Sequence, residues 1–265
     1  MYSKTQLVFK YLRYYLAAKN GKGHGMHSPF VFDFITNVLN DERSFYAYEQ
    51  IEAVRNELLH DEKLLTIEDF GAGSRVNKTN QRSVAAIAAS SLKPKKYGQL
   101  LFRMVDHYQP AHVLELGTSL GITTAYLAAA NPAAKVTTME GAAEVATAAQ
   151  KNFEQLQLHN IRLVLGDFEK TLSTALQSIP TVDFAFIDGN HRYEPTVKYF
   201  RQILEKANDK SIIILDDIHW SEEMERAWRE VQQHDAVMLT IDLFFIGIVL
   251  LRKEFKVKQH FAVRF

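Results

Sequence analysis

The sequence predicts an α/β fold in which a mostly parallel sheet carries helices on both faces. From residue 111 onward, apolar runs of strand length alternate with stretches of helical periodicity, the pattern of successive β–α units. The last two apolar runs are separated by a turn too short for a parallel crossover, so they must form a C-terminal antiparallel hairpin. The first hundred residues lack this alternation. We therefore expect an N-terminal helical extension over residues 1–97, acting as a substrate-side lid, and an α/β domain over residues 98–265.

The extension is predicted to consist of helices separated by glycine and proline. Apolar side chains from Leu7 to Leu16 recur at helical spacing and predict a helix over residues 3–19. Residues 1–30 hold five Lys or Arg and no acid. A basic amphipathic helix can lie on a membrane surface, but more often packs on its own protein or on a second subunit. We expect a homodimer through the N-terminal helices and no stable membrane insertion. Further helices are predicted over residues 30–39, 48–60, 81–91 and 98–108.

The elements of the α/β domain follow one another in regular order. Strands are predicted over residues 112–116, 135–140, 161–165, 184–188, 211–216, 237–242 and 245–252. Helical patterns begin near residues 122, 142, 169, 193 and 222. The longest apolar run, Leu243 to Leu251, has nine residues. It falls far below the roughly 20 residues that span a bilayer and predicts a buried strand.

Composition limits the classes of function. The chain has no cysteine, which excludes disulfides, thiolate metal sites and a cysteine nucleophile, and fits a cytoplasmic protein. Its formal net charge is zero, so we expect no nucleic-acid partner. The N-terminus lacks the apolar segment followed by small residues of a secretory signal.

A glycine loop follows the first strand of the α/β domain and leads into a helix. Its order is Glu115-x-Gly117-x-x-x-Gly121, which differs from the G-x-G-x-x-G spacing of dinucleotide-binding proteins. Gly117 and Gly121 allow the backbone to approach a ligand closely. Thr118 and Ser119 present hydroxyl and N–H groups at a helix N-terminus, where a carboxylate can bind. The loop resembles the first motif of class I methyltransferases that use S-adenosylmethionine.

A second glycine loop, Asp69-Phe70-Gly71-Ala72-Gly73, also resembles that motif. No acid follows it until Asp106, and no strand–helix–strand unit comes after it. After Gly121, by contrast, Glu140 and Gly141 close the very next strand. We therefore place the cofactor site at the loop that begins at Gly117, and expect residues 69–73 to form a turn or a lid.

Acidic residues close three successive strands, and the carboxyl ends of parallel strands share one edge of the sheet. We expect Glu115 to accept from the ammonium group of the cofactor and Glu140, followed by Gly141, to accept from its ribose diol. Asp167 would accept from the adenine amino group, and Phe168 would stack on the adenine ring. Together these residues predict an S-adenosylmethionine site.

Three more aspartates follow the fourth and fifth strands: Asp188, then Asp216 and Asp217. Oxygen ligands of this kind suit a hard cation such as Mg²⁺. Their positions resemble the metal ligands of catechol and caffeoyl-CoA type O-methyltransferases, which carry an Asp after the fourth strand and an Asp-Asn or similar pair after the fifth. The Asp-Asp pair departs from that pattern by adding negative charge. The resemblance spans roughly residues 98–252.

The resemblance also suggests a base. In catechol-type enzymes a lysine lies three residues past the first metal aspartate; here that position is His191, which titrates in a useful range. We therefore expect His191 and Asp188 to serve in catalysis, with His219 as the second candidate base. Tyr193, Trp220 and Trp228 could line an aromatic pocket.

The family implies metal-assisted O-methylation of a small hydroxylated acceptor. Two alternatives stay open. The first is a metal-independent N- or protein methyltransferase of the same fold. The second is a non-catalytic cofactor-binding module that docks a partner.

Overall fold

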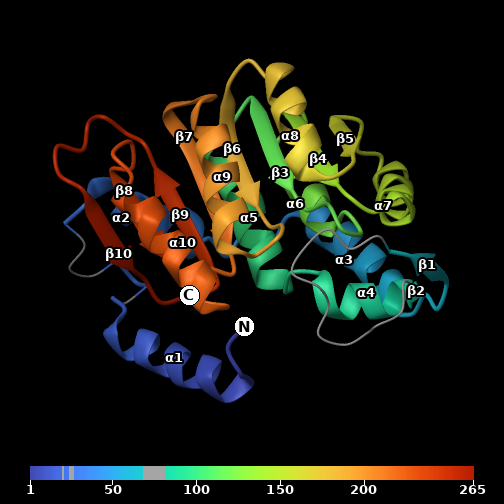
Figure 1. The fold of residues 1–265 in the computed structure, drawn as a ribbon, viewed down its shortest axis with the longest axis horizontal. Coiled ribbons are helices and arrows are strands. Elements are labelled where there is room, and N and C mark those ends of the chain that lie inside the picture. The colour runs from blue at the N-terminus through green and yellow to red at the C-terminus, as the bar shows by residue number, and fades with distance from the viewer. Residues whose placement is uncertain (20, 24–26, 68–80) are drawn as a thin grey trace. The chain divides into compact units, whose positions relative to one another are not determined.

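The computed structural model describes four stretches of the chain, residues 1–19, 21–23, 27–67 and 81–265. It divides into two compact units (Figure 1). Unit 1 combines Met1–Asp41 with Ile179–Phe265, and unit 2 is Glu42–Ser178. The expected division after residue 97 stays a prediction.

Unit 2 is built on three parallel strands whose bounds match those predicted. They are β3 (His112–Leu116), β4 (Lys135–Glu140) and β5 (Ile161–Leu165), in that order. Each pair is joined through a helix, as a parallel crossover requires. The helices are α6 (Ile122–Ala130) between β3 and β4, α7 (Ala143–Gln155) between β4 and β5, and α8 (Phe168–Gln177) after β5.

Helices on the N-terminal side complete the core of unit 2. They are α3 (Tyr46–Leu59), α4 (Val84–Ser91) and α5 (Lys95–Tyr108), with a short antiparallel hairpin of β1 (Leu64–Thr66) and β2 (Gln81–Ser83). Helix α5 packs on α6 at Gly98, where a Cβ would lie 2.6 Å from the ring of Tyr126. The missing side chain at Gly98 therefore allows the two helices to approach closely.

Unit 1 carries five strands in the order β10-β8-β9-β7-β6. Their bounds are β6 (Val182–Ile187), β7 (Ala207–Asp216), β8 (Leu239–Asp242), β9 (Ile246–Leu250) and β10 (Gln259–Ala262). β6 and β7 are parallel, and β8 and β9 form the predicted antiparallel hairpin, with β9 antiparallel to β7. The expectation of mostly parallel strands closed by a hairpin is confirmed. β10, which pairs parallel to β8, was not expected because its sequence is short and polar.

The helices of unit 1 are α1 (Lys4–Ala17), α2 (Pro29–Phe34), α9 (Tyr193–Leu204) and α10 (Glu222–Gln233). Helix α9 covers β6 and β7, and α10 packs beside it (Figure 1). The helix predicted over residues 30–39 is α2 followed by a π-helical turn, Ile35–Leu39. Within the described residues, no helix has the length and apolar character needed to cross a membrane.

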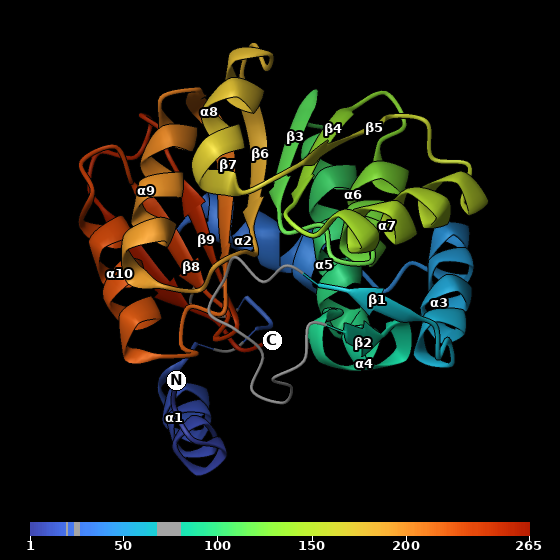
Figure 2. The same cartoon turned by 45° about the vertical axis from the view of Figure 1, so that its right-hand side comes forward.

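Helix α1 lies at the margin of unit 1, below α10 in both ribbon views (Figures 1 and 2). Glu225 on α10 anchors it: Lys10 Nζ lies 2.8 Å from Glu225 Oε1, and the Tyr2 hydroxyl donates to Glu225 Oε2 at 2.9 Å. Farther along α1, the Tyr14 hydroxyl donates to the carbonyl oxygens of Asp242 and Val263. One side of α1 is thus fixed to the unit at both ends.

The Glu225 anchor makes the attachment of α1 depend on pH. Burial acts to raise the pKa of Glu225, but hydrogen bonds from Lys10, His219 and Tyr2 outweigh burial and hold the pKa below its ordinary value. A lowered carboxyl pKa stabilises the folded state fully above the ordinary value, and the stabilisation is lost as the pH falls through the lowered one. We expect Glu225→Gln to weaken the attachment by about 1 kcal/mol, since these groups are partly exposed.

Amide hydrogen exchange in α1 measures this effect directly. Exchange should quicken in Glu225→Gln at neutral pH and quicken less in the same variant at acidic pH, where the wild type has already lost its anchor. Glu222→Gln, an exposed change in the same helix turn, is the control and should behave as wild type. Equal exchange in all three proteins would contradict the anchor.

Candidate active site

The glycine loop between β3 and α6 is fastened to the end of β4. The N–H groups of Gly117 and Thr118 both donate to the Met139 carbonyl at 3.0 Å. Gly117, Ser119 and Gly121 take positive φ values of 104°, 48° and 82°, so the chain turns sharply before the helix begins. The loop is therefore held in shape by the neighbouring strand.

Thr118 and Ser119, which were expected to bind a carboxylate, already make hydrogen bonds within the protein. Thr118 is buried, and its hydroxyl lies 2.6 Å from that of Thr138. The Ser119 N–H donates to Glu140 Oε2 at 2.8 Å. Contact of Thr118 and Ser119 with the cofactor stays a prediction.

Glu115 belongs to a buried network that ties β3, β4 and α6 together. Its carboxylate is fully buried, and Oε2 accepts from Thr138 at 2.7 Å and from the Thr124 hydroxyl. Its role in the structure is thus to join three elements under the loop. Its contact with a cofactor ammonium stays a prediction.

Glu140 lies at the end of β4, where it supports two turns at once. Oε2 accepts from Ser119, and Oε1 accepts from the N–H of Ala142 at 2.9 Å, across the predicted Gly141. Burial raises the pKa of Glu140, while the backbone N–H groups act to lower it. The carboxylate is half-buried, and each of its oxygens has a second lone pair for a ligand hydroxyl.

We expect Glu140→Ala to reduce the affinity for S-adenosylmethionine by about 1–3 kcal/mol, because the ribose diol would lose a charged acceptor. Calorimetric titration measures this, with Glu154→Ala, an exposed acid on α7, as the control. Because only the ionised carboxylate accepts from both hydroxyls, wild-type affinity should fall as the pH drops through the raised pKa of Glu140. Equal affinity in wild type and Glu140→Ala would refute the site.

Asp167 and Phe168 follow β5 as predicted. Asp167 is the N-cap of α8, and its Oδ1 accepts from the Glu169 N–H at 3.0 Å. Gly166, with φ 133°, donates from its N–H to the Glu140 carbonyl at 2.8 Å, so the ends of β4 and β5 are tied. Asp167 and Phe168 are half-buried. Their contacts with adenine stay predictions.

In unit 1, the structure brings together Asp188, His191 and Asp216. One ligand atom from each lies within 4.8 Å of the other two, and His191 Nε2 is 3.5 Å from Asp188 Oδ1. Asp188 follows β6 and Asp216 ends β7, which are paired strands. Positive φ values at Asn190 and His191, 70° and 33°, turn the loop after β6.

This donor set fits a divalent cation. Two carboxylates provide the hard oxygen ligands that Mg²⁺ prefers, and Mg²⁺ commonly keeps several waters beside one or two carboxylates. Asp217, expected as the third ligand, does not belong to the cluster. Its backbone takes φ 51°, and its side chain lies on a separate pocket instead. His191, expected as the base, lies in the cluster.

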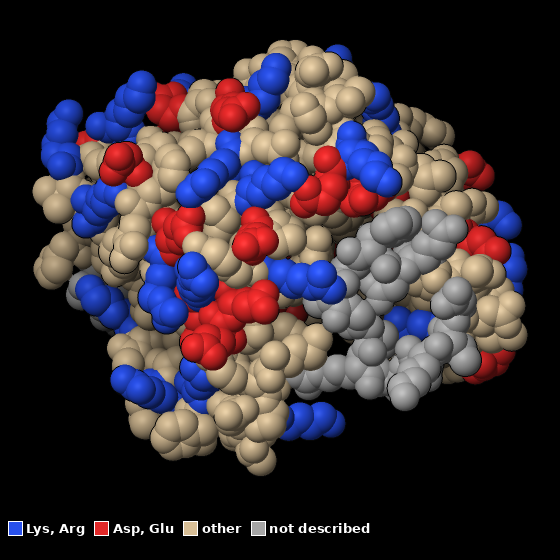
Figure 3. Space-filling model, viewed as in Figure 1, with Lys and Arg blue, Asp and Glu red and all other residues tan. Residues whose placement is uncertain are grey.

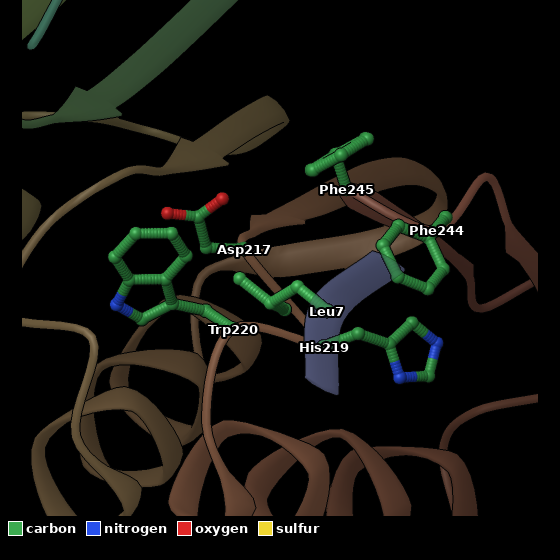
Figure 4. A pocket seen from close by; sticks show the side chains of 6 residues that line it. All are labelled: Leu7, Asp217, His219, Trp220, Phe244 and Phe245. Carbon is green, nitrogen blue, oxygen red and sulfur yellow. The ribbon is translucent and has the colours of Figure 1, made fainter. Parts of the chain in front are cut away.

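That pocket is lined mostly by aromatic side chains (Figure 4). It is lined by residues from α1, from the segment after β7 and from the β8–β9 turn, namely Leu7, Asp217, His219, Trp220, Phe244 and Phe245. The sequence predicted Trp220 as a pocket residue but did not predict Leu7, Phe244 or Phe245. A pair of phenylalanines in a tight hairpin turn was the one available signal for the last two.

The remaining candidates have other partners. Both ring nitrogens of His219 face carboxylates, at 2.8 Å from Asp242 and 3.1 Å from Glu225. Burial acts to lower the pKa of His219, but the two carboxylates outweigh it and raise the pKa. Both ring nitrogens are thus engaged by carboxylates of the protein, which leaves neither directed at a substrate. Trp228 is a core residue whose ring covers Gly247 of β9, where a Cβ would lie 2.6 Å away.

Tyr193 is also outside the pocket. Its ring lies under Arg226, whose guanidinium carbon is 3.9 Å from the ring centroid, and its hydroxyl donates to Glu230. The second glycine loop, residues 69–73, lies outside the described residues.

Comparison with known proteins shows what this chain is similar to. Residues 114–218 match a family model described as a methyltransferase domain. Over 143 residues the chain is 27% identical to a catechol O-methyltransferase of Niastella koreensis, covering 53% of this chain and 63% of that protein. The chain thus spans less than two thirds of the length of that relative.

Solved structures share the fold. An O-methyltransferase from Bacillus cereus in complex with SAH superposes with a TM-score of 0.57 at 19% identity, covering 82% of this chain and 96% of that one. The SAH-bound methyltransferase PaMTH1 of Podospora anserina gives 0.58 at 13% identity, covering 96% and 98%. The predicted fold class is confirmed.

Proposed function

We propose that this chain, which has the class I methyltransferase fold and carries a methyltransferase domain, transfers a methyl group from S-adenosylmethionine to an oxygen of a small hydroxylated acceptor. The observation that carries the proposal is the cluster of Asp188, His191 and Asp216 at the carboxyl ends of two paired strands. The loop from Gly117 to Gly121, which is hydrogen-bonded to Glu140 through Ser119, would bind the cofactor.

Methyl transfer needs a deprotonated acceptor held in line with a methyl group that the cofactor has already activated. The acceptor oxygen forms a bond to the methyl carbon, and the carbon–sulfur bond breaks with its electrons on sulfur. We assign His191 Nε2 to take the hydroxyl proton. Asp188, 3.5 Å away, stabilises the imidazolium that results.

Asp188 and Asp216 would hold a divalent cation, and Mg²⁺ is the metal we propose. When bound, such a cation lowers the pKa of a coordinated hydroxyl. The 27% identity to a catechol O-methyltransferase supports a hydroxylated, catechol-like acceptor. The absence of cysteine supports a cytoplasmic setting.

A chelation experiment tests the proposed function. Purified protein is incubated with S-adenosylmethionine and a panel of small phenols and catechols, with and without a chelator, and methylated product is measured. We expect turnover that is lost on chelation and returns with added Mg²⁺. Full activity under chelation would favour a metal-independent methyltransferase. Tight cofactor binding without turnover of any acceptor would favour a non-catalytic binding module.

A further inference from the structure

Helix α1 has two faces of different character. The side chains that point toward unit 1 are half-buried, namely Leu7, Lys10, Tyr11 and Tyr14. Tyr11 packs edge-on against Phe244 with ring centroids 5.0 Å apart. Every other residue of the helix is exposed, and none of its side chains is fully buried.

The opposite face is apolar. It presents five large side chains that are 45–80% exposed, Val8, Phe9, Leu12, Tyr15 and Leu16, which we call the outer stripe. At about 100° per residue they occupy an arc of roughly 120° on one side of the helix. A contiguous apolar stripe of this kind on a surface marks an interaction site.

The charges beside the outer stripe indicate its partner. On the helical wheel, Lys4 lies at one edge of the stripe and Arg13 at the other, and both are exposed. No acid occurs in residues 1–30. In Figure 3 the lowest part of unit 1 shows blue and tan atoms, and red atoms border it from above. A second α1 packed on this stripe would bring like charges together, whereas an anionic surface would neutralise them.

We propose that α1 docks this protein on an anionic lipid bilayer, with the outer stripe in the headgroup boundary and Lys4 and Arg13 on the lipid phosphates. The helix has 14 residues and is therefore about 21 Å long, too short to cross a hydrocarbon core of roughly 30 Å. It would lie in the plane of the surface. Contacts of its inner face with Glu225 and Phe244 keep the stripe facing outward before any lipid is met.

Co-sedimentation with lipid vesicles tests the proposal on the full chain. We expect binding to vesicles of phosphatidylcholine with 30% phosphatidylserine, and weak binding to phosphatidylcholine alone or at high salt. Leu12→Ser/Leu16→Ser should lower binding at least tenfold. Lys4→Glu/Arg13→Glu, which leaves the stripe intact, should lower it roughly 20-fold or more on anionic vesicles.

Matched controls change similar residues away from α1. Leu64→Ser removes an exposed leucine of unit 2 and Lys253→Glu reverses an exposed charge, and both variants should bind as wild type. Because every substituted side chain is exposed, all variants should keep the wild-type thermal unfolding temperature. If a stripe variant fails to fold, the charge-reversed variant alone decides.

Two results would overturn the proposal. One is equal vesicle binding by wild type and the charge-reversed variant. The other is a wild type that does not bind vesicles but is a dimer by light scattering, together with a Leu12→Ser/Leu16→Ser variant that is a monomer. The stripe would then be an interface between two copies of the chain.

Discussion

Replacing Asp216 by asparagine should lower methyl transfer by roughly a hundredfold or more while leaving cofactor affinity nearly unchanged. Asp216 is fully buried at the end of β7, and one of its oxygens lies within 4.8 Å of ligand atoms of Asp188 and His191. Asparagine keeps the shape and one oxygen but removes the charge that would hold a cation. The measurement is turnover as a function of Mg²⁺ concentration, beside calorimetric titration with S-adenosylmethionine.

Asp217→Asn provides the comparison, because Asp217 is the next residue and lies outside the cluster. The Mg²⁺ concentration for half-maximal activity should rise strongly in Asp216→Asn and only slightly in Asp217→Asn. An equal rise of this Mg²⁺ concentration in the two variants would show that Asp217 also binds the metal. It would contradict the assignment of Asp188 and Asp216 alone as carboxylate ligands.

The second large effect is expected on stability. Gly121→Ala should destabilise the protein by about 3 kcal/mol, for two reasons. Gly121 has φ +82°, and a Cβ there would lie 2.5 Å from Phe153 Cε1 and 3.2 Å from Ala149 Cβ. Phe153 is fully buried, so its ring has little space to move. Urea unfolding monitored by circular dichroism measures the loss.

A double variant separates the two causes. Phe153→Leu should itself destabilise the protein, but Gly121→Ala should cost less in the Phe153→Leu background, because the clash is relieved while the backbone strain remains. Additive losses would show that the contact with Phe153 is unimportant. The role of Gly121 is thus to let α6 and α7 pack closely, in addition to the approach to a ligand that its sequence position predicts.

The sequence predicted the elements of the fold better than the roles of single side chains. The strands of unit 2 could be placed to the residue because their apolar runs are bounded by glycine, proline and acid. β10 could not, since a short polar strand is stabilised only by its pairing with β8. The helices could likewise be predicted from their periodicity. The π-helical turn after Phe34 could not, because it depends on packing and no local sequence pattern predicts it.

At the candidate site, the sequence identified which strands end in acids but not where each carboxylate points. Asp216 and Asp217 are adjacent and chemically equal, and a left-handed backbone at Asp217 separates them. The sequence predicts that Glu115 binds a ligand. In the fold, its carboxylate accepts hydrogen bonds from the hydroxyls of Thr124 and Thr138. Such differences arise from backbone angles and contacts between distant segments, which no local pattern encodes.

The double hydrogen bond from Gly117 and Thr118 to the Met139 carbonyl has a consequence for cofactor recognition. A loop already closed on its neighbour loses little conformational entropy when a ligand arrives, so more of the contact energy remains as affinity. Association should then be limited by diffusion and desolvation rather than by a folding step in the loop. The acceptor of both bonds is the backbone carbonyl of Met139, so the proposed preorganisation of the loop depends on the path of β4 and not on the methionine side chain.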